Sequence, residues 1–315
     1  MRNNIHRRRE SRLGRQIRSD PIGKSSTVGI FVRDDATQGC TLHVGEWQHL
    51  KLLGSMLDGV VSGEVVGVAG SLDERGTAMT VTHVFTPGGS VRVPPIPLPA
   101  HIILVCPAPN TDWGRLVPTR GCERVIVCGG WRRQVELVAR LADAFFHSTT
   151  LTRENERVSV PVTVLARQDD TGVCGTGFPV PPPEKHRFQG HPNVELKGNP
   201  FTLTHDHCME IAGSGGEPVD SILEHTPGIQ TPMQALERCV DASHLAPTSP
   251  SHLKSSSGRT QRTMCLPPSG VHLLVAGNQP SFQAKTHKRT GTLMVCVPRG
   301  GVVRVVLSSM QAFCQ

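Results

Sequence analysis

The sequence has no tyrosine, and aromatic residues make up only 4% of its 315 residues. Modules that bind single-stranded nucleic acid without sequence preference combine a basic groove with aromatic side chains on which the bases stack. In the strand-rich region near the amino terminus, only Phe31, Trp47 and Phe85 could serve as such platforms. Single-strand binding is therefore not expected to be the main role of the chain.

Long apolar runs are also missing. No stretch approaches the roughly 18 apolar residues that a membrane span requires, and no charged-then-apolar leader with a small-residue cleavage site opens the chain. The hydrophobic content of 37% is nevertheless enough to fill a core, and the chain is long enough for two domains. We therefore expect an intracellular, soluble protein.

Paired cysteines are absent, because the ten cysteines stand singly and form no C-x-x-C motif. Cys106, Cys128 and Cys296 each end an apolar run, where a free thiol behaves as a small hydrophobic side chain. This usage predicts a reducing compartment.

One ligand-like cluster remains, in the stretch THDHC with His205, His207 and Cys208. A structural metal site needs about four ligands, and no second ligand pair lies nearby in the sequence. An exposed strand or turn is favoured over a metal site here.

The net charge of +7 is concentrated at the amino terminus. Residues 1–24 hold eight Lys or Arg and two acidic residues, which gives 8 − 2 = +6 and leaves 7 − 6 = +1 for the rest. A body that grips a nucleic-acid backbone would be expected to carry its own basic stripe. We predict that residues 1–26 are a disordered basic arm, with a nuclear import signal, a weak DNA contact and a mitochondrial leader as alternative roles.

Residues 27–92 are typical of a small β-barrel. Short runs rich in β-branched residues alternate with turns, and the turn at 73–76 joins two runs into a hairpin. Residues 45–57 place Trp47 and three leucines on one helical face, which predicts a short helix. The expected closure of these strands is an OB-like barrel.

Four prolines in residues 91–101 predict an extended connector, and we place the domain boundary at residue 93. Short apolar runs then recur, and a helical pattern covers residues 132–146. The apolar runs span residues 101–106, 124–128, 160–165, 272–276 and 292–297, and the last residues add one or two strands. Runs of this kind predict a layered α/β domain over residues 93–315, so that the chain as a whole is α+β. Residues 245–270 are polar and rich in Pro and Ser, which predicts an exposed loop.

Two motif-rich segments stand out in this second domain. LKGNPFTLTHDHCMEIAGSGGEPVDSILEHT, residues 196–226, has an Asn-Pro-aromatic start, a strand, a glycine-rich turn and an acidic helix. LERCVDASHLAPTSPSHL, residues 236–253, is followed after an insertion by GVHLLVAGNQPSF. In this order the motifs resemble the small, or B, subunit of replicative DNA polymerases, specifically that of DNA polymerase delta. The GNQPSF loop favours delta over the related subunits of polymerases epsilon and alpha.

The resemblance is strong after residue 197 and weaker before it. VVSGEVVGVAGSLDERG, residues 60–76, resembles the last part of that subunit's OB-fold, and VPVTVLARQDD, residues 160–170, resembles the family's third core strand. The family's OB-fold begins further upstream, so the barrel of this chain is expected to be shortened or differently built at its start. The absence of tyrosine marks a divergent member.

The resemblance implies that the larger domain has the calcineurin-like metallophosphoesterase fold. An active site of that fold holds two metals about 3.5–4 Å apart with Asp, His and Asn at successive strand ends. At the matching strand ends this chain has Cys106-Pro107-Ala108, Gly129-Gly130, Ala166-Arg167-Gln168-Asp169 and Gly277-Asn278-Gln279-Pro280. Asp112, Asp169, His205 and His207 are too few to rebuild the site. The resemblance therefore implies no catalytic, cofactor-binding or metal-binding residue, with an active metal-dependent phosphoesterase as the alternative.

A non-catalytic scaffold subunit in the nucleus is the expected function. The resemblance implies a heteromeric complex with the polymerase catalytic subunit, held at its C-terminal domain, and with a third accessory subunit. DNA contact is expected to be indirect, or weak through the basic arm. Residues 178–188, FPVPPPEKHRF, are either a docking surface or a rigid surface loop. Four large aromatic side chains are expected to pack rather than to bind a partner, namely Trp113, Trp131, Phe178 and Phe201.

Overall fold

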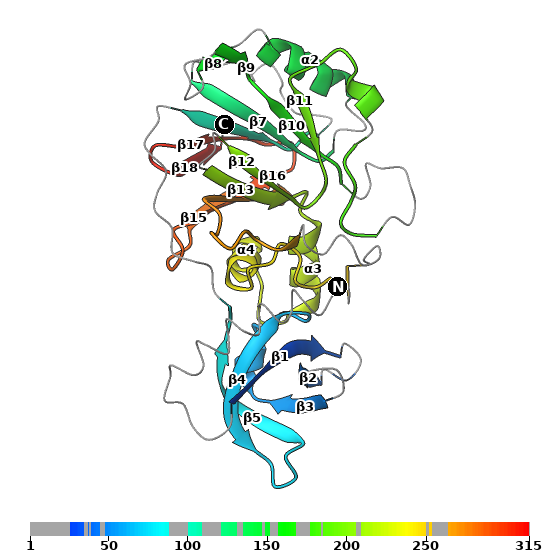
Figure 1. Cartoon of the computed structure of the whole chain (residues 1–315), viewed down its shortest axis with the longest axis vertical. Coiled ribbons are helices and arrows are strands. Elements are labelled where there is room, and N and C mark those ends of the chain that lie inside the picture. The colour runs from blue at the N-terminus through cyan, green and yellow to red at the C-terminus, as the bar shows by residue number, and fades with distance from the viewer. Residues whose placement is uncertain are drawn as a thin grey trace. The chain divides into compact units, whose positions relative to one another are not determined.

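The chain is mixed α/β, with strands in the majority and three α-helices among the residues that the structure describes (Figure 1). The computed structural model describes residues 26–34, 37, 39–44, 48–87, 100–108, 121–130, 135–146, 149–151, 157–167, 177–183, 185–205, 209–249, 252–253 and 264–314. Residues 1–25 of the predicted arm and residues 91–99 of the proline-rich connector lie outside these residues, whereas Ser26 begins the first strand and His101 begins a strand of the second unit. None of the described helices is long and apolar enough to cross a membrane.

Two compact units make up the chain. The first combines Met1–Gly89 with Pro218–Cys265, and the second combines Ser90–Glu217 with Leu266–Gln315. Each unit is therefore built from two separate stretches of the sequence. The predicted domain limits at residues 27–92 and 93–315 stay a prediction.

A closed five-stranded barrel forms the amino-terminal part of the first unit, which is consistent with the predicted OB-like domain. Its order is β1-β2-β3-β5-β4, with β4 and β5 joined as the predicted hairpin. The strands are β1 (Ser26–Arg33), β2 (Cys40–Val44), β3 (Gln48–Leu53), β4 (Val65–Leu72) and β5 (Ala78–Phe85). Phe31 is 0% exposed in the barrel core, so it is not available to stack on a base.

The helix predicted for residues 45–57 is wrong. Gln48–Leu53 is strand β3, and only Ser55–Leu57 forms a single 3₁₀ turn, η1. Strand β3 pairs with β2 on one side and with β5 on the other, so its backbone groups are satisfied in the barrel ladder. Trp47, which contributed to the helical pattern, lies outside the described residues.

Two helices complete the first unit: α3 (Glu217–His225), which matches the predicted acidic helix, and α4 (Pro232–Asp241). Helix α4 begins with a capping box, because the hydroxyl of Thr231 accepts from the backbone N–H of Gln234 and the side chain of Gln234 accepts from the N–H of Thr231. Pro232 at the first helical position fits this start.

The exposed loop predicted for residues 245–270 is wrong for its first part. Residues 245–249 are buried. The hydroxyls of Ser221 and Thr248 lie 2.9 Å apart, and Gly63 approaches the carbonyl oxygen of Pro247 so closely that a Cβ there would lie 2.2 Å from it. The segment is therefore buried because it packs on the barrel and on helix α3, although its Pro-rich and Ser-rich composition predicts an exposed loop.

The second unit contains two mixed sheets. The six-stranded sheet has the order β11-β10-β7-β6-β17-β18, with its first four strands parallel. Its strands are β6 (His101–Val105), β7 (Cys122–Cys128), β10 (Val162–Leu165), β11 (Val194–Lys197), β17 (Val302–Val306) and β18 (Gln311–Cys314). The five-stranded sheet has the order β12-β13-β14-β16-β15, with parallel central strands and antiparallel edges. Its strands are β12 (Phe201–His205), β13 (Met209–Ser214), β14 (Leu273–Gln279), β15 (Gln283–Thr286) and β16 (Leu293–Pro298).

The sheets pack face to face, and helix α2 (Val135–Phe146) covers the other face of the six-stranded sheet (Figure 1). Leu104 and Ile126 meet Ile211 and Val275 between the sheets. The predicted helix is thus confirmed over Val135–Phe146, with residues 132–134 outside the described residues, and the expected layered α/β arrangement is also confirmed. Smaller elements are the ribbon of β8 (Thr149–Leu151) with β9 (Arg157–Ser159), and the 3₁₀ turn η4 (Lys185–Phe188).

Two of the four aromatic residues expected to pack are buried: Phe178 is 1% exposed and Phe201 is 4% exposed. Trp113 and Trp131 lie outside the described residues. The proline-rich segment 178–188 is tied to the sheet by a backbone bridge between Val180 and Asn199. This attachment favours the rigid-loop interpretation of the segment.

Candidate functional site

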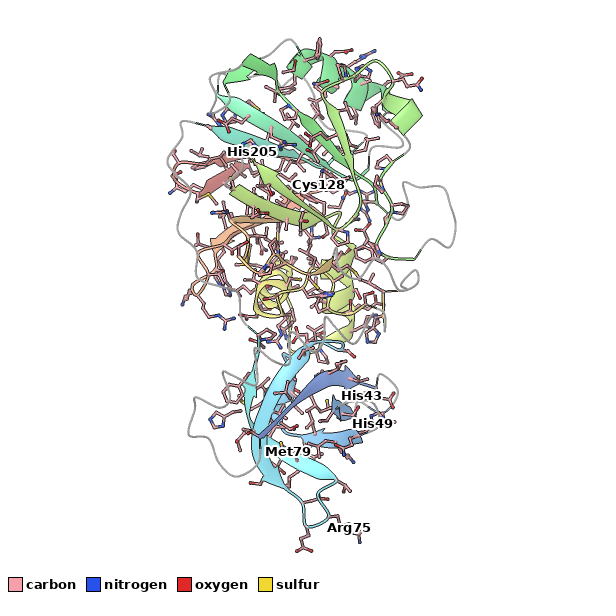
Figure 2. The ribbon with its side chains drawn as sticks, in the orientation of Figure 1. His43, His49, Arg75, Met79, Cys128 and His205 are labelled. Carbon is pink, nitrogen blue, oxygen red and sulfur yellow. The ribbon has the colours of Figure 1, made fainter. Side chains whose placement is uncertain are left out.

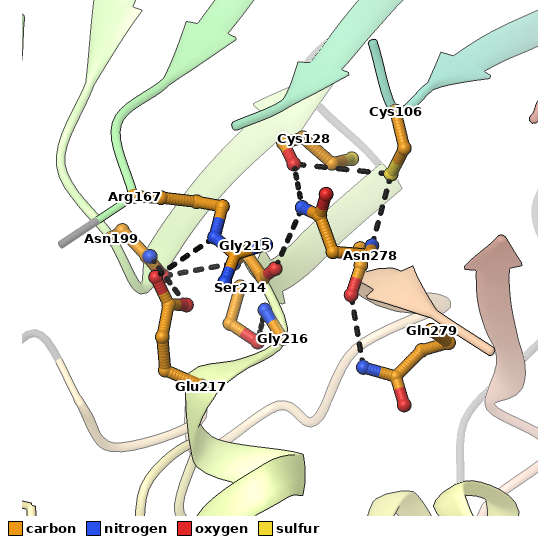
Figure 3. A network of polar contacts seen from close by, with 11 residues as sticks. Cys106, Cys128, Arg167, Asn199, Ser214, Gly215, Gly216, Glu217, Asn278 and Gln279 are labelled. Carbon is orange, nitrogen blue, oxygen red and sulfur yellow. Dashed lines mark hydrogen bonds and ion pairs between the residues drawn. The ribbon is translucent and has the colours of Figure 1, made fainter. Parts of the chain in front are cut away.

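The ends of five strands of the second unit meet at one edge of the two sheets (Figure 3). Cys106 follows β6, Cys128 ends β7, Arg167 follows β10, Ser214 ends β13 and Asn278 lies near the end of β14. These are the strand ends at which the resemblance places a dimetal site. We call the set the strand-end cluster; it consists of Cys106, Cys128, Arg167, Asn199, Ser214, Gly215, Gly216, Glu217, Asn278 and Gln279.

Asn278 joins three strand ends. Its side-chain Nδ2 donates to the carbonyl oxygen of Cys128 at 2.8 Å and to that of Gly215 at 3.0 Å, and its backbone N–H donates to Sγ of Cys106 at 3.1 Å. The residue has φ of 55°, in the left-handed region that Asn tolerates better than most residues. The amide is therefore aimed at carbonyl oxygens at the ends of β7 and β13.

The glycine before it makes this approach sterically possible. A Cβ on Gly277 would lie 2.6 Å from Cβ of Cys128 and 3.1 Å from Sγ of Cys106. The next residue, Gln279, is 0% exposed and donates from Nε2 to the carbonyl oxygen of Gly277 at 2.9 Å. Residues Gly277, Asn278 and Gln279 therefore contact one another and the neighbouring strand ends.

Arg167 occupies the other half of the cluster. A Cβ on Gly129 would lie 2.2 Å from Cγ of Arg167, and a Cβ on Gly215 would lie 2.8 Å from the same atom. Because these two glycines have no side chain, there is room for the arginine side chain to cross the strand ends. Its Nε lies 3.7 Å from Oε1 of Glu217, and Nδ2 of Asn199 donates to Oε2 of the same carboxylate at 2.9 Å.

The chemistry of this arrangement is that of a closed polar network. Metals need lone pairs, whereas the inward-facing groups of Asn278 and Arg167 are N–H donors. The carboxylate of Glu217 is turned toward the arginine and Asn199, and hydrogen bonding with the neighbouring Cys106, followed by burial, raises the pKa of the Cys128 thiol. Among the residues that the structure describes, no group of three or more His, Cys, Asp or Glu side chains could hold a metal ion.

The chain matches no protein-family model, and no curated protein sequence matches it. The polymerase resemblance therefore rests on the quoted motifs.

His205, labelled with Cys128 in Figure 2, lies away from the strand-end cluster, because it contacts Glu123 at the start of β7 whereas Cys128 ends that strand. It ends β12, which runs antiparallel to β13, so it lies at the opposite ends of the strands. Its Nε2 is 2.7 Å from Oε2 of Glu123 at the start of β7, and it is 8% exposed. The prediction of an exposed strand or turn is therefore wrong about its exposure, while His207 and Cys208 lie outside the described residues.

A second histidine lies in the same part of the unit. Nδ1 of buried His101 is 3.4 Å from a guanidinium nitrogen of Arg304. Burial and this cation lower the pKa of His101 to about 4, against a smaller opposing effect of Glu123. His101 is therefore neutral at pH 7.

The sequence identified the strand ends but not all of their contacts. Pro107, Ala108 and Gly130 lie at the expected strand ends, whereas Asp112, Gln168 and Asp169 lie outside the described residues. Two partners in the network, Asn199 and Glu217, were missed. A usable signal existed for both, because Asn199 opens the Asn-Pro-aromatic motif and Glu217 follows the glycine-rich turn.

Proposed function

We propose that the chain is a non-catalytic accessory subunit of a replicative DNA polymerase, of the delta type. Three features support the proposal: the ordered motifs of residues 196–282, a closed five-stranded barrel, and a layered unit of two packed sheets. In this interpretation the barrel is an OB-fold and the second unit is a phosphoesterase-like domain. Fold alone does not assign an activity, so the proposal depends on the residues at the strand ends.

The observation that carries the proposal is the pair of N–H donors in the strand-end cluster. Asn278 donates to two carbonyl oxygens where a dimetal enzyme would present imidazole, and Arg167 places a cation near the positions of the ions. Two divalent ions at this edge would be repelled by the guanidinium and would find few free lone pairs. The network instead supports a role in holding the strand ends together.

The proposed partners are the C-terminal domain of the polymerase catalytic subunit and a third accessory subunit. The proposed location is the nucleus. A scaffold of this kind needs surfaces rather than a catalytic centre, which agrees with the internal contacts that Asn278, Arg167 and Asn199 make at the strand ends.

Co-expression tests the proposal directly. The full chain is expressed with the C-terminal domain of the delta catalytic subunit from the same source, and in parallel with the matching domains of the epsilon and alpha catalytic subunits. We expect a one-to-one complex with the delta domain in size-exclusion chromatography at about 0.5 M salt, where surface charge attraction is largely screened. Co-elution with only the epsilon or alpha domain would reassign the chain, and separate elution from all three would overturn the proposal.

A phosphodiesterase assay tests the non-catalytic part. We expect no Mn²⁺-dependent hydrolysis of bis-p-nitrophenyl phosphate beyond that of heat-denatured chain. Hydrolysis that is lost when Glu217 or Asn199 is replaced would show that the strand-end cluster is an active site.

A further inference from the structure

The basic residues of the folded body are unevenly distributed along the chain. Asp241 is the last acidic residue, and residues 242–315 hold eight Lys or Arg, which gives 8 − 0 = +8. Residues 25–241 hold 17 basic and 24 acidic residues, which gives 17 − 24 = −7. The sum of +1 for residues 25–315 is therefore made of two oppositely charged parts.

Three of these cations lie close together in the second unit. Lys285 is in β15, the edge strand of the five-stranded sheet, and Lys288 and Arg289 are in the turn between β15 and β16. All three residues are exposed. We call residues 283–293 the basic hairpin.

Buried residues hold the turn of the basic hairpin in place. His287, Thr290 and Thr292 are 7%, 2% and 1% exposed. Nδ1 of His287 is 2.9 Å from Oγ1 of Thr290, which is 2.9 Å from Oγ1 of Thr292. The hydroxyl of Thr292 donates to the carbonyl oxygen of Val271 at 2.7 Å, which ties the turn to the residues before β14.

Backbone bonds add to this anchor. The N–H of His287 donates to the carbonyl oxygen of Thr292 at 2.8 Å, and the N–H of Gly291 donates to that of His287 at 2.9 Å. Gly291 has φ of 71°, which glycine adopts without strain. Lys288 and Arg289 therefore project from a backbone that is already ordered, so less conformational entropy is lost when they bind.

A simpler role explains only one of the three cations. Lysine on an edge strand discourages pairing with another chain, and Lys285 is placed for that purpose. Lys288 and Arg289 lie beyond the strand, where no ladder needs protection.

We propose that the basic hairpin binds the phosphate backbone of duplex DNA without reading its sequence. Exposed lysine and arginine side chains provide contacts of this kind, and phosphate contacts supply most of the affinity of non-specific binding. The hairpin has no Phe, Trp or Tyr, and its one imidazole is buried, so it offers no platform for the stacked bases of a single strand. The proposal does not depend on the polymerase assignment.

The test measures the salt dependence of binding by the full chain. A fluorescein-labelled duplex of about 20 base pairs is titrated with protein at KCl concentrations from about 50 to about 200 mM. The triple variant K285Q/K288Q/R289Q is compared with a matched control, R75Q/R140Q/K185Q, which neutralises three other exposed cations. Figure 2 labels one of these, Arg75, at the tip of the β4–β5 hairpin.

We expect the hairpin variant to lower the slope of log affinity against log salt by about 2.7, because each duplex phosphate contact contributes about 0.9. Over a fourfold salt range this corresponds to roughly 40-fold in relative affinity. The control should leave the slope unchanged, since net charge alone does not create a contact. If the hairpin triple variant does not fold, the single variant K288Q should lower the slope by about 0.9.

Three results would overturn the proposal. The first is an equal change of slope in the hairpin variant and in the control, and the second is no binding of the duplex by the wild-type chain. In the third, the wild-type chain binds poly-glutamate but not the duplex, and the hairpin substitutions abolish the binding to poly-glutamate. That result would assign the surface to an acidic protein.

Discussion

Arg238 of helix α4 and Glu64 of the barrel form a two-point ion pair inside the first unit. Nε of the guanidinium donates to Oε1 of the carboxylate at 2.7 Å, and Nη2 contacts the other oxygen. The Glu64 side chain is 1% exposed and that of Arg238 is 15% exposed. Burial raises the pKa of the Glu64 carboxyl although the guanidinium next to it acts in the opposite direction. The pair therefore holds helix and barrel together at a large desolvation cost.

Removing one partner of this pair should lower the free energy of unfolding more than removing both partners does. Glu64→Leu or Arg238→Met leaves the remaining group buried with its main partner lost, and we expect a loss of about 3–5 kcal/mol in the free energy of unfolding. The double variant Glu64→Leu with Arg238→Met should recover most of that loss, because neither charge is then desolvated. Urea unfolding of the four proteins gives the coupling, and strictly additive losses would contradict the argument.

Asn278 allows a graded test of the strand-end cluster. Asn278→Gly keeps the left-handed backbone but removes the amide that two carbonyl oxygens accept from, with an expected loss of about 1–3 kcal/mol. Asn278→Ala adds strain of about 1 kcal/mol at φ of 55°. Asn278→Asp should be the least stable, because a carboxylate would face the oxygens of Cys128 and Gly215. If the Asp variant were as stable as the wild type, a cation would have to occupy the cluster.

The sequence predicted the layers of the second unit better than its contacts. Residues 132–146 have a clear helical period, and the apolar runs that became β6, β7 and β14 are too short for helices. Residues 45–57 were predicted wrongly because Leu50 and Leu53 fit a helical face, whereas strand β3 buries Leu52 and leaves Leu53 exposed, and its pairing with β2 and β5 determines that outcome. The contact between Arg167 and Glu217 joins residues 50 positions apart, and no local period encodes it.

His101 should make the stability of the second unit depend on pH. Its pKa is lowered from 6.5 to about 4 in the folded chain by burial and by Arg304. Below pH 6.5 the unfolded chain therefore binds a proton that the folded chain refuses, so stability is complete above 6.5 and falls as the pH is lowered toward about 4. By linkage the loss from this residue is at most about 3 kcal/mol.

The His101 contribution is measured as a difference between two proteins. Urea unfolding at pH 7.5 and at pH 4.5 is compared for the wild type and His101→Gln, because the difference between the two proteins isolates the effect of this residue. The variant should lose less stability between the two pH values than the wild type does. If the free energy of unfolding depended on pH identically in both proteins, protonation of His101 would not destabilise the folded chain.

The thiols should differ sharply in reactivity with a maleimide reagent at about pH 8, because only the thiolate is nucleophilic. Burial raises the pKa of Cys122 and of Cys296 to about 12, and it also raises the pKa of Cys239. Cys314 is exposed on the edge strand β18 and should be labelled first, with partly exposed Cys265 next. Peptide mass spectrometry before and after unfolding in urea checks the order. Rapid native labelling of Cys296 would mean that the five-stranded sheet opens readily at β16, which the 0% exposure of Cys296 and the pairing of β16 with β14 and β15 argue against.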